Sequence, residues 1–98
     1  METLYTHTSW KVKPGREDDF VQRWGEWVDW SHRQGLRQEA LLLRDVDGPG
    51  TFVSFGLWES LDAVRGWRLL PGYQERVERL GEVVDGFEPR TLAVVDRR

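Results

Sequence analysis

The two histidines of the sequence are the side chains that ordinarily titrate near neutral pH, so they are the default candidates for a general base. His7 lies in a predicted strand, on the face opposite Trp10. We expect it at a contact between subunits, or turned toward a pocket if the strand carries a bulge. His32 lies near the predicted end of a helix, where a positive charge is favoured, and is interpreted as a surface or capping residue. His7 is therefore the candidate base.

Six tryptophans in 98 residues are the unusual feature of the composition. Trp58 ends a predicted strand on the same face as Ser54, and either packs in the core or forms a pocket wall that stacks on a flat ligand. Trp10, Trp27 and Trp67 are placed to approach one cavity. Such a cavity would be flat-walled and apolar, which suits an aromatic small molecule.

An arginine adds one candidate ligand contact, and missing residue types and motifs exclude several kinds of site. Arg76 or Arg68 at the mouth of such a pocket would pair with an acidic group of a ligand. The sequence contains no cysteine, which excludes disulfides, thiolate metal sites and a cysteine nucleophile, and two histidines leave little for a metal site. There is no glycine-rich phosphate loop, no G-x-S-x-G and no H-E-x-x-H. We therefore expect no metal.

The overall charge and hydropathy bear on partners and location. A net charge of -3 argues against a general nucleic-acid binder, which would carry a basic face. No apolar run approaches the ~20 residues needed to cross a bilayer, and the first residues show no signal-peptide pattern. We expect a cytoplasmic protein with no nucleic-acid or membrane partner. The preference for arginine over lysine is typical of a GC-rich bacterial genome.

The elements that must position these side chains alternate between strand and helix patterns. Period-two alternation predicts four strands, over residues 4–12, 36–46, 51–58 and 87–96. Helical spacing of apolar residues predicts three helices, over residues 16–34, 61–68 and 73–84. The turn at residues 47–50 makes a hairpin of the second and third strands, and Ser60 is the predicted N-cap of the second helix. Trp30 lies outside the apolar stripe of the first helix, so we place it beside the core or on the surface.

This order predicts an α+β fold of the ferredoxin-like, split βαβ type, as one domain over residues 1–98. Its helices cover one face of a four-stranded antiparallel sheet. The second and third strands are apolar on both faces, so the uncovered face would expose a large apolar patch, which a soluble monomer avoids. We expect a homodimer in which two sheets pack face to face.

Three segments resemble the antibiotic biosynthesis monooxygenase family: residues 12–20, residues 35–50 and residues 52–63. The third segment, a hydrophobic strand ending in Trp58-Glu59-Ser60, is the most specific. The resemblance covers nearly the whole chain. It implies a homodimeric α+β barrel with one pocket in each subunit, between the sheet and the helices.

Cofactor-free, quinone-forming members of this family oxidise phenolic, polycyclic substrates with O₂. They use an Asn four positions before the strand-end Trp, that Trp, and a Tyr six positions after it. The matching positions here hold Ser54, Trp58 and Val64. Only the Trp is kept, and Val64 cannot donate a proton.

Haem-degrading members use an Asn on the first strand, a second Trp, and a His ten residues after that Trp. The matching positions hold approximately Thr8, then Trp67 and Val77. The histidine that would bind iron is absent from its expected place, which argues against haem degradation.

The resemblance therefore implies a cofactor-independent monooxygenase that acts on a small aromatic, phenolic molecule with O₂, in bacterial secondary metabolism. The catalytic candidates are Trp58, Ser54 and His7. The substrate-binding candidates are Thr8, Trp10, Trp27, Trp67 and Arg76. Two alternatives stay open: a binding domain without catalysis, which the loss of the Asn and Tyr favours, and an oxygen-independent cyclase, isomerase or decarboxylase in the same pocket.

Overall fold

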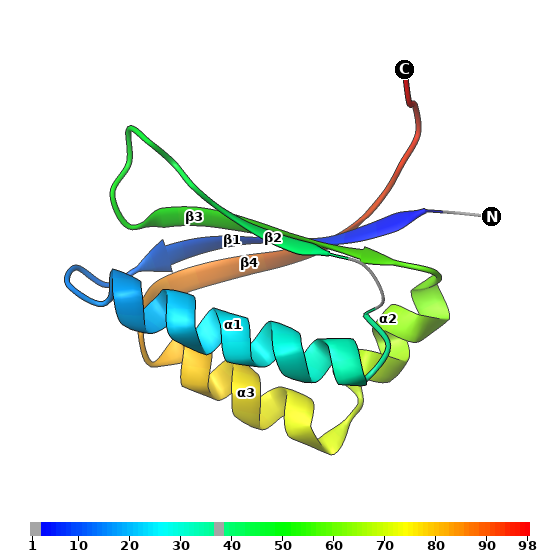
Figure 1. The fold of residues 1–98 in the computed structure, drawn as a ribbon, viewed down its shortest axis with the longest axis horizontal. Coiled ribbons are helices and arrows are strands. Elements are labelled where there is room, and N and C mark those ends of the chain that lie inside the picture. The colour runs from blue at the N-terminus through cyan, green and yellow to red at the C-terminus, as the bar shows by residue number, and fades with distance from the viewer. Residues whose placement is uncertain (1–2, 37–38) are drawn as a thin grey trace.

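The computed structural model describes residues 3–36 and 39–98, which form a sheet with all helices on one of its faces (Figure 1). The strands are β1 (Leu4–Val12), β2 (Ala40–Arg44), β3 (Thr51–Trp58) and β4 (Val84–Ala93). The helices are α1 (Glu17–Arg33), α2 (Leu61–Arg68) and α3 (Pro71–Gly81). The element order is the predicted one.

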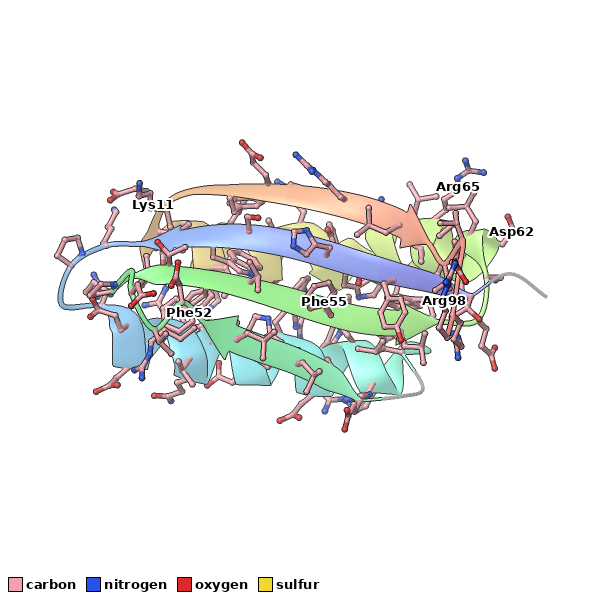
Figure 2. All side chains as sticks on the ribbon, turned by 90° about the horizontal axis from the view of Figure 1, so that it is seen from above. Lys11, Phe52, Phe55, Asp62, Arg65 and Arg98 are labelled. Carbon is pink, nitrogen blue, oxygen red and sulfur yellow. The ribbon has the colours of Figure 1, made fainter. Side chains whose placement is uncertain are left out.

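All strand pairs are antiparallel, and the strands lie in the order β2-β3-β1-β4, which Figure 2 shows from the open face. The two central strands are thus the first and third in the chain. This topology confirms the predicted ferredoxin-like α+β class. The register places Thr8 opposite Ser54 and His7 opposite Phe55 on neighbouring strands.

Several predicted boundaries were wrong by a few residues. Strand β2 is shorter than residues 36–46, because Leu36 still belongs to the turn after α1, where its amide donates to the Ser31 carbonyl at 3.1 Å. Residues 37 and 38 of that predicted strand lie outside the described residues. Helix α3 starts earlier, at Pro71, a residue favoured in the first turn of a helix, where its missing N–H costs nothing. Strand β4 also starts earlier, at Val84, which pairs with Val12.

Helix α3 and strand β4 also end three residues before the predicted residues 84 and 96, at Gly81 and Ala93. The other boundaries match closely. Strands β1 and β3 and helix α2 have the predicted bounds, and the Ser60 hydroxyl accepts from the Ala63 amide at 3.1 Å, which confirms the N-cap. His32 lies exposed at the end of α1, where its Nδ1–H donates to the Leu36 carbonyl at 2.7 Å. Its place on the surface is thus as expected, and its hydrogen bond goes to a carbonyl three residues beyond the helix.

The core lies between the sheet and the helices, in two clusters. One contains Trp10, Phe20, Phe52, Leu80 and neighbours at one end of the sheet. The other contains Trp30, Leu36, Trp58, Val64 and Trp67 at the opposite end. The half-buried Trp27 packs against both clusters, so the space beside it is where a site between sheet and helices can form.

The other face of the sheet is left open by the helices (Figure 2). Phe55 lies there at the middle of β3, with its ring centroid 4.9 Å from that of His7 and 6.4 Å from that of Tyr5. Leu41, Leu43 and Leu92 are 46%, 46% and 40% exposed. This apolar surface is the one that motivates the predicted dimer, and the dimer itself stays a prediction.

Candidate functional site

A cavity of about 30 Å³ lies between the sheet and the three helices. Strands β1 and β3 supply its floor through alternate side chains that point toward the helices, among them Thr6, Thr8, Ser54 and Trp58. Helices α1, α2 and α3 supply its walls. Because a strand has a period of two, the residues between these floor positions lie on the open face instead.

Two hydroxyls lie next to each other on the floor, because Thr8 and Ser54 face each other across β1 and β3. They are only 7% and 6% exposed. The Ser54 hydroxyl accepts a hydrogen bond of 2.9 Å from Nε1 of Trp10. Ser54 is therefore already occupied as an acceptor, and its own O–H remains a donor.

The walls are mainly aromatic. The Trp67 ring lies at the centre of the group, with its centroid 4.9 Å from that of Trp58, 5.4 Å from that of Trp27 and 4.8 Å from that of Tyr73. The Trp67 indole donates to Ser31 Oγ at 2.9 Å, and the Trp58 indole donates to Thr6 Oγ1 at 3.1 Å. These bonds fix the rings of Trp58 and Trp67 as flat surfaces.

Two other indole groups in the walls have no such partner. Nε1 of Trp24 and Nε1 of Trp27 are buried and make no hydrogen bond. Both residues line the cavity. A buried donor without an acceptor costs about 1–3 kcal/mol, so a ligand oxygen that accepted from these groups would recover that cost.

The polar end of the cavity combines a phenol with a cation. Burial raises the pKa of the Tyr73 phenol, and the nearby charge and hydrogen bond of Arg68 only partly oppose this effect. Arg68 also donates to Thr91 Oγ1 at 3.1 Å, which anchors its guanidinium. Tyr73 thus stays a neutral O–H donor at physiological pH, and the end of the cavity where it lies carries one positive charge.

The tyrosine can be titrated by itself in a Tyr5→Phe variant, because the chain has two tyrosines. We expect its midpoint, followed by tyrosinate absorbance, to lie above the ordinary value of 10.0 in the folded protein and to return to about 10 in urea. The folded state favours the neutral phenol, so this stabilisation is present below pH 10 and is lost as the pH rises through the folded pKa. Equal midpoints in the folded and denatured protein would contradict the burial argument.

The structure brings most of the predicted site residues to this cavity. Ser54, Trp58, Thr8, Trp27 and Trp67 all line it. Trp10 lies directly behind Ser54, to which its indole is bonded, and is 3% exposed. It supports the floor of the cavity.

Two predicted residues lie elsewhere. His7 points to the open face of the sheet, because the one irregularity between β1 and β4 comes at residues 11 and 12, too late in the strand to turn it. Arg76 points away from the cavity mouth, since its guanidinium carbon lies 4.5 Å from the centre of the Trp30 ring. Trp30 is 8% exposed and belongs to the second core cluster, so the expectation that it lies beside the core or on the surface was wrong.

The cavity wall also contains residues that we did not select from the sequence as site residues. Tyr73 and Trp24 lie on helices predicted from apolar spacing alone, and Arg68 was placed only at the mouth of the pocket. The signal for Tyr73 was its polar hydroxyl on an otherwise apolar stripe. Among the described lining residues there is no carboxylate and no imidazole, so the cavity holds donors but no strong base.

Solved structures share this fold over nearly the whole chain. A variant of SnoaB, a cofactor-independent oxygenase from Streptomyces nogalater, superimposes with a TM-score of 0.90 at 18% identity, covering 99% of this chain and 97% of that one. A candidate antibiotic biosynthesis monooxygenase from Bordetella bronchiseptica gives 0.83 at 21% identity, over 100% of both chains. At these identities the likeness shows the fold alone.

The sequence itself matches the model of the antibiotic biosynthesis monooxygenase family over residues 3–79, and the chain belongs to that family. No curated protein sequence matches it. In the part of the chain that the structure describes, no helix is long and apolar enough to cross a membrane.

Proposed function

We propose that this protein is a cofactor-independent monooxygenase that oxidises a small phenolic, aromatic molecule with O₂. The observation that carries the proposal is the set of donors in an aromatic, base-free cavity: the unpartnered indole N–H groups of Trp24 and Trp27, with the Tyr73 phenol and the Arg68 guanidinium. Such a set favours a ligand with anionic oxygen. Family membership and the SnoaB-like fold agree with this class of reaction.

The donors would act by stabilising the deprotonated substrate. A positive charge and hydrogen bonds to an oxyanion lower the pKa of the substrate hydroxyl, so that water suffices to take the proton. The resulting phenolate delocalises its charge onto a ring carbon. That carbon reduces O₂ and forms a C–O bond to it, and the carbon hydroperoxide then loses water to leave a quinone carbonyl. For a CH₂ group the balance is one O₂ consumed, and one C=O and one H₂O formed.

The residues of the floor and walls have distinct parts in this scheme. Trp58 and Trp67 provide flat surfaces that stack on the substrate ring, and Ser54 and Thr8 donate to its polar edge. Tyr73 supplies the phenol donor that Val64 does not. Val64 is fully buried beside Trp58 and Trp67, where it only packs. His7 has no part in this scheme, since it lies on the other face of the sheet.

Substrate entry requires the walls to move. A cavity of about 30 Å³ holds about one water molecule, whereas sites for drug-sized ligands measure roughly 300–1,000 Å³. Trp24, Trp27 and Tyr73 are only half-buried, so their rings are the parts of the wall that can swing outward. The rigidly bonded Trp58 and Trp67 would stay in place.

The protein would work as a homodimer. The open face of the sheet offers Tyr5, Phe55 and Leu57 on the central strands, and Leu41, Leu43 and Leu92 on the outer ones. No helix or strand of the described residues covers them. A second sheet packed on this surface would remove the apolar area from water. Each subunit would keep its own cavity on the other side of its sheet.

The reaction is tested with an anthrone that carries phenolic hydroxyl groups. We expect ligand-induced thermal stabilisation, O₂ uptake above the rate of spontaneous oxidation, and one O₂ consumed per quinone formed. The control is the same protein after heat denaturation. Stabilisation without O₂ uptake would overturn the proposal in favour of a binding domain, and a product formed under nitrogen would favour oxygen-independent chemistry.

Ser54→Ala and Trp58→Phe variants test the floor in the same assay. We expect both to lower the rate of quinone formation, because one removes a donor and the other reduces the stacking surface. If both turn over at the rate of the unmodified protein, neither residue takes part in the reaction.

A further inference from the structure

A second pocket lies on the outer side of the helical layer, between α1 and α3, and is separate from the cavity described above. Its volume is about 180 Å³. Four arginines line it: Arg23 and Arg33 from α1, and Arg76 and Arg79 from α3. The chain as a whole has a net charge of -3, so this concentration of cations runs against its overall composition.

The carboxylates near the pocket neutralise only part of this charge. Arg23 is held by Asp19 at 3.0 Å and Glu82 at 2.6 Å, and it also donates to the Arg79 carbonyl, so its role is structural. Glu26, the one acidic residue of the lining, lies 3.6 Å from Arg79 in a pair whose side chains are both more than half exposed. Such an exposed pair is weak, so Arg79 can leave Glu26 and bind a ligand instead.

The other two cations are not neutralised. Among the described residues, neither Arg33 nor Arg76 forms an ion pair with a carboxylate. Glu26 is therefore opposed by Arg33, Arg76 and Arg79, which leaves an excess of two positive charges in the pocket.

Arg76 is held in position before any ligand binds. Its guanidinium carbon lies 4.5 Å from the centre of the Trp30 ring, and its Nη1 donates to the Gly72 carbonyl at 3.1 Å. Gly72 makes this approach possible, because a Cβ there would lie 2.5 Å from Arg76 Nη1 and 3.1 Å from the Trp30 ring. A planar guanidinium fixed on an aromatic ring keeps further N–H groups for a ligand and loses little entropy on binding.

We propose that this pocket is a binding site for a phosphate group, either free inorganic phosphate or the phosphate of a phosphorylated small molecule. A tetrahedral dianion matches the excess of two positive charges and accepts the paired N–H groups that guanidinium presents. Arg76 and Arg33 bind it directly, and Arg79 turns to it from Glu26. Trp27 lines both this pocket and the inner cavity, so an anion bound in the pocket would lie beside a residue that also forms part of the cavity wall. The proposal does not depend on the oxygenase reaction.

The test is calorimetric titration of the purified protein with inorganic phosphate and with phenyl phosphate, against sodium chloride at matched ionic strength. We expect saturable binding of phosphate that chloride does not reproduce. Binding of phenyl phosphate at least tenfold tighter than that of phosphate would assign the site to a phosphorylated small molecule, and equal binding would assign it to the free ion. Absence of saturable binding of both would overturn the proposal.

Three variants localise the binding. Arg76→Gln and Arg33→Gln are each expected to weaken it by about tenfold or more, because each removes a charge-assisted hydrogen bond. Arg33 is exposed, so its replacement leaves the fold intact. Arg65→Gln, an exposed position on α2 outside the pocket, is the matched control and should bind as the unmodified protein does. Equal affinity in all three variants would place the anion elsewhere and refute the site.

Discussion

Arg68→Gln is expected to lower kcat/KM for a phenolic substrate by roughly 10²–10³-fold, the usual effect of removing one donor to a developing oxyanion. The Arg68 guanidinium is the one positive charge among the described residues that line the cavity, and it is anchored by Thr91 beside Tyr73. The measurement is steady-state O₂ uptake. Arg65→Gln, three residues earlier on the same helix and exposed, is the matched control and should leave kcat/KM unchanged.

The pH profile separates an electrostatic role of Arg68 from a structural one. A nearby cation lowers the pKa of the substrate hydroxyl, so its loss raises that pKa. Because kcat reports ionisations of the enzyme–substrate complex, the acid limb of kcat is expected to move to higher pH in Arg68→Gln, with the loss of kcat largest at low pH and smaller at high pH. A pH-independent loss, or an unchanged rate, would contradict the proposed role.

Phe55→Asp is expected to convert a dimer into a monomer with a mass of 11.5 kDa, measured by sedimentation equilibrium. Phe55 lies at the middle of the open face, on a central strand and against His7 (Figure 2). In a two-fold symmetric dimer the change occurs twice in one interface, and burying each carboxylate at the centre of an apolar surface costs several kcal/mol even with the His7 imidazole beside it. The dissociation constant should therefore rise by roughly 10⁴-fold or more.

The control for this prediction introduces a charge on another exposed apolar side chain. Leu69 is 83% exposed at the end of α2, away from the sheet, so Leu69→Lys should remain dimeric. Circular dichroism checks that Phe55→Asp still folds. A monomeric unmodified protein at micromolar concentration, or a Phe55→Asp variant of unchanged mass, would refute face-to-face packing of the sheets.

Local patterns were sufficient for much of the site. The period of two in β1 and β3 determines that Thr8, Ser54 and Trp58 share the covered face, while His7 and Phe55 share the other. The bounds of β1 and β3 follow from alternation, and the start of α2 follows from the N-cap at Ser60. These features depend on interactions between residues close in sequence, which a sequence displays directly.

Other features depend on how distant elements pack. The short β2 and the early start of β4 reflect contacts of Leu36, Val83 and Val84, which no local pattern marks. The early start of α3 does have a local signal, in Pro71. The bulge that would have turned His7 toward the cavity occurs later in β1, where its effect falls on Val12. The sequence allowed either position for the irregularity, because the choice depends on the pairing with β4.

The amino-acid sequence by itself determined the order of elements, the two faces of the sheet and the aromatic character of the cavity, because these follow from short-range periodicity and side-chain type. Only the tertiary structure decided which helix residues complete the cavity. It brought Trp24, Arg68 and Tyr73 to the lining of the cavity and placed Arg76 against Trp30 instead. The reason is geometric: the angle and rotation of α1, α2 and α3 on the sheet are set by packing among residues far apart in the chain.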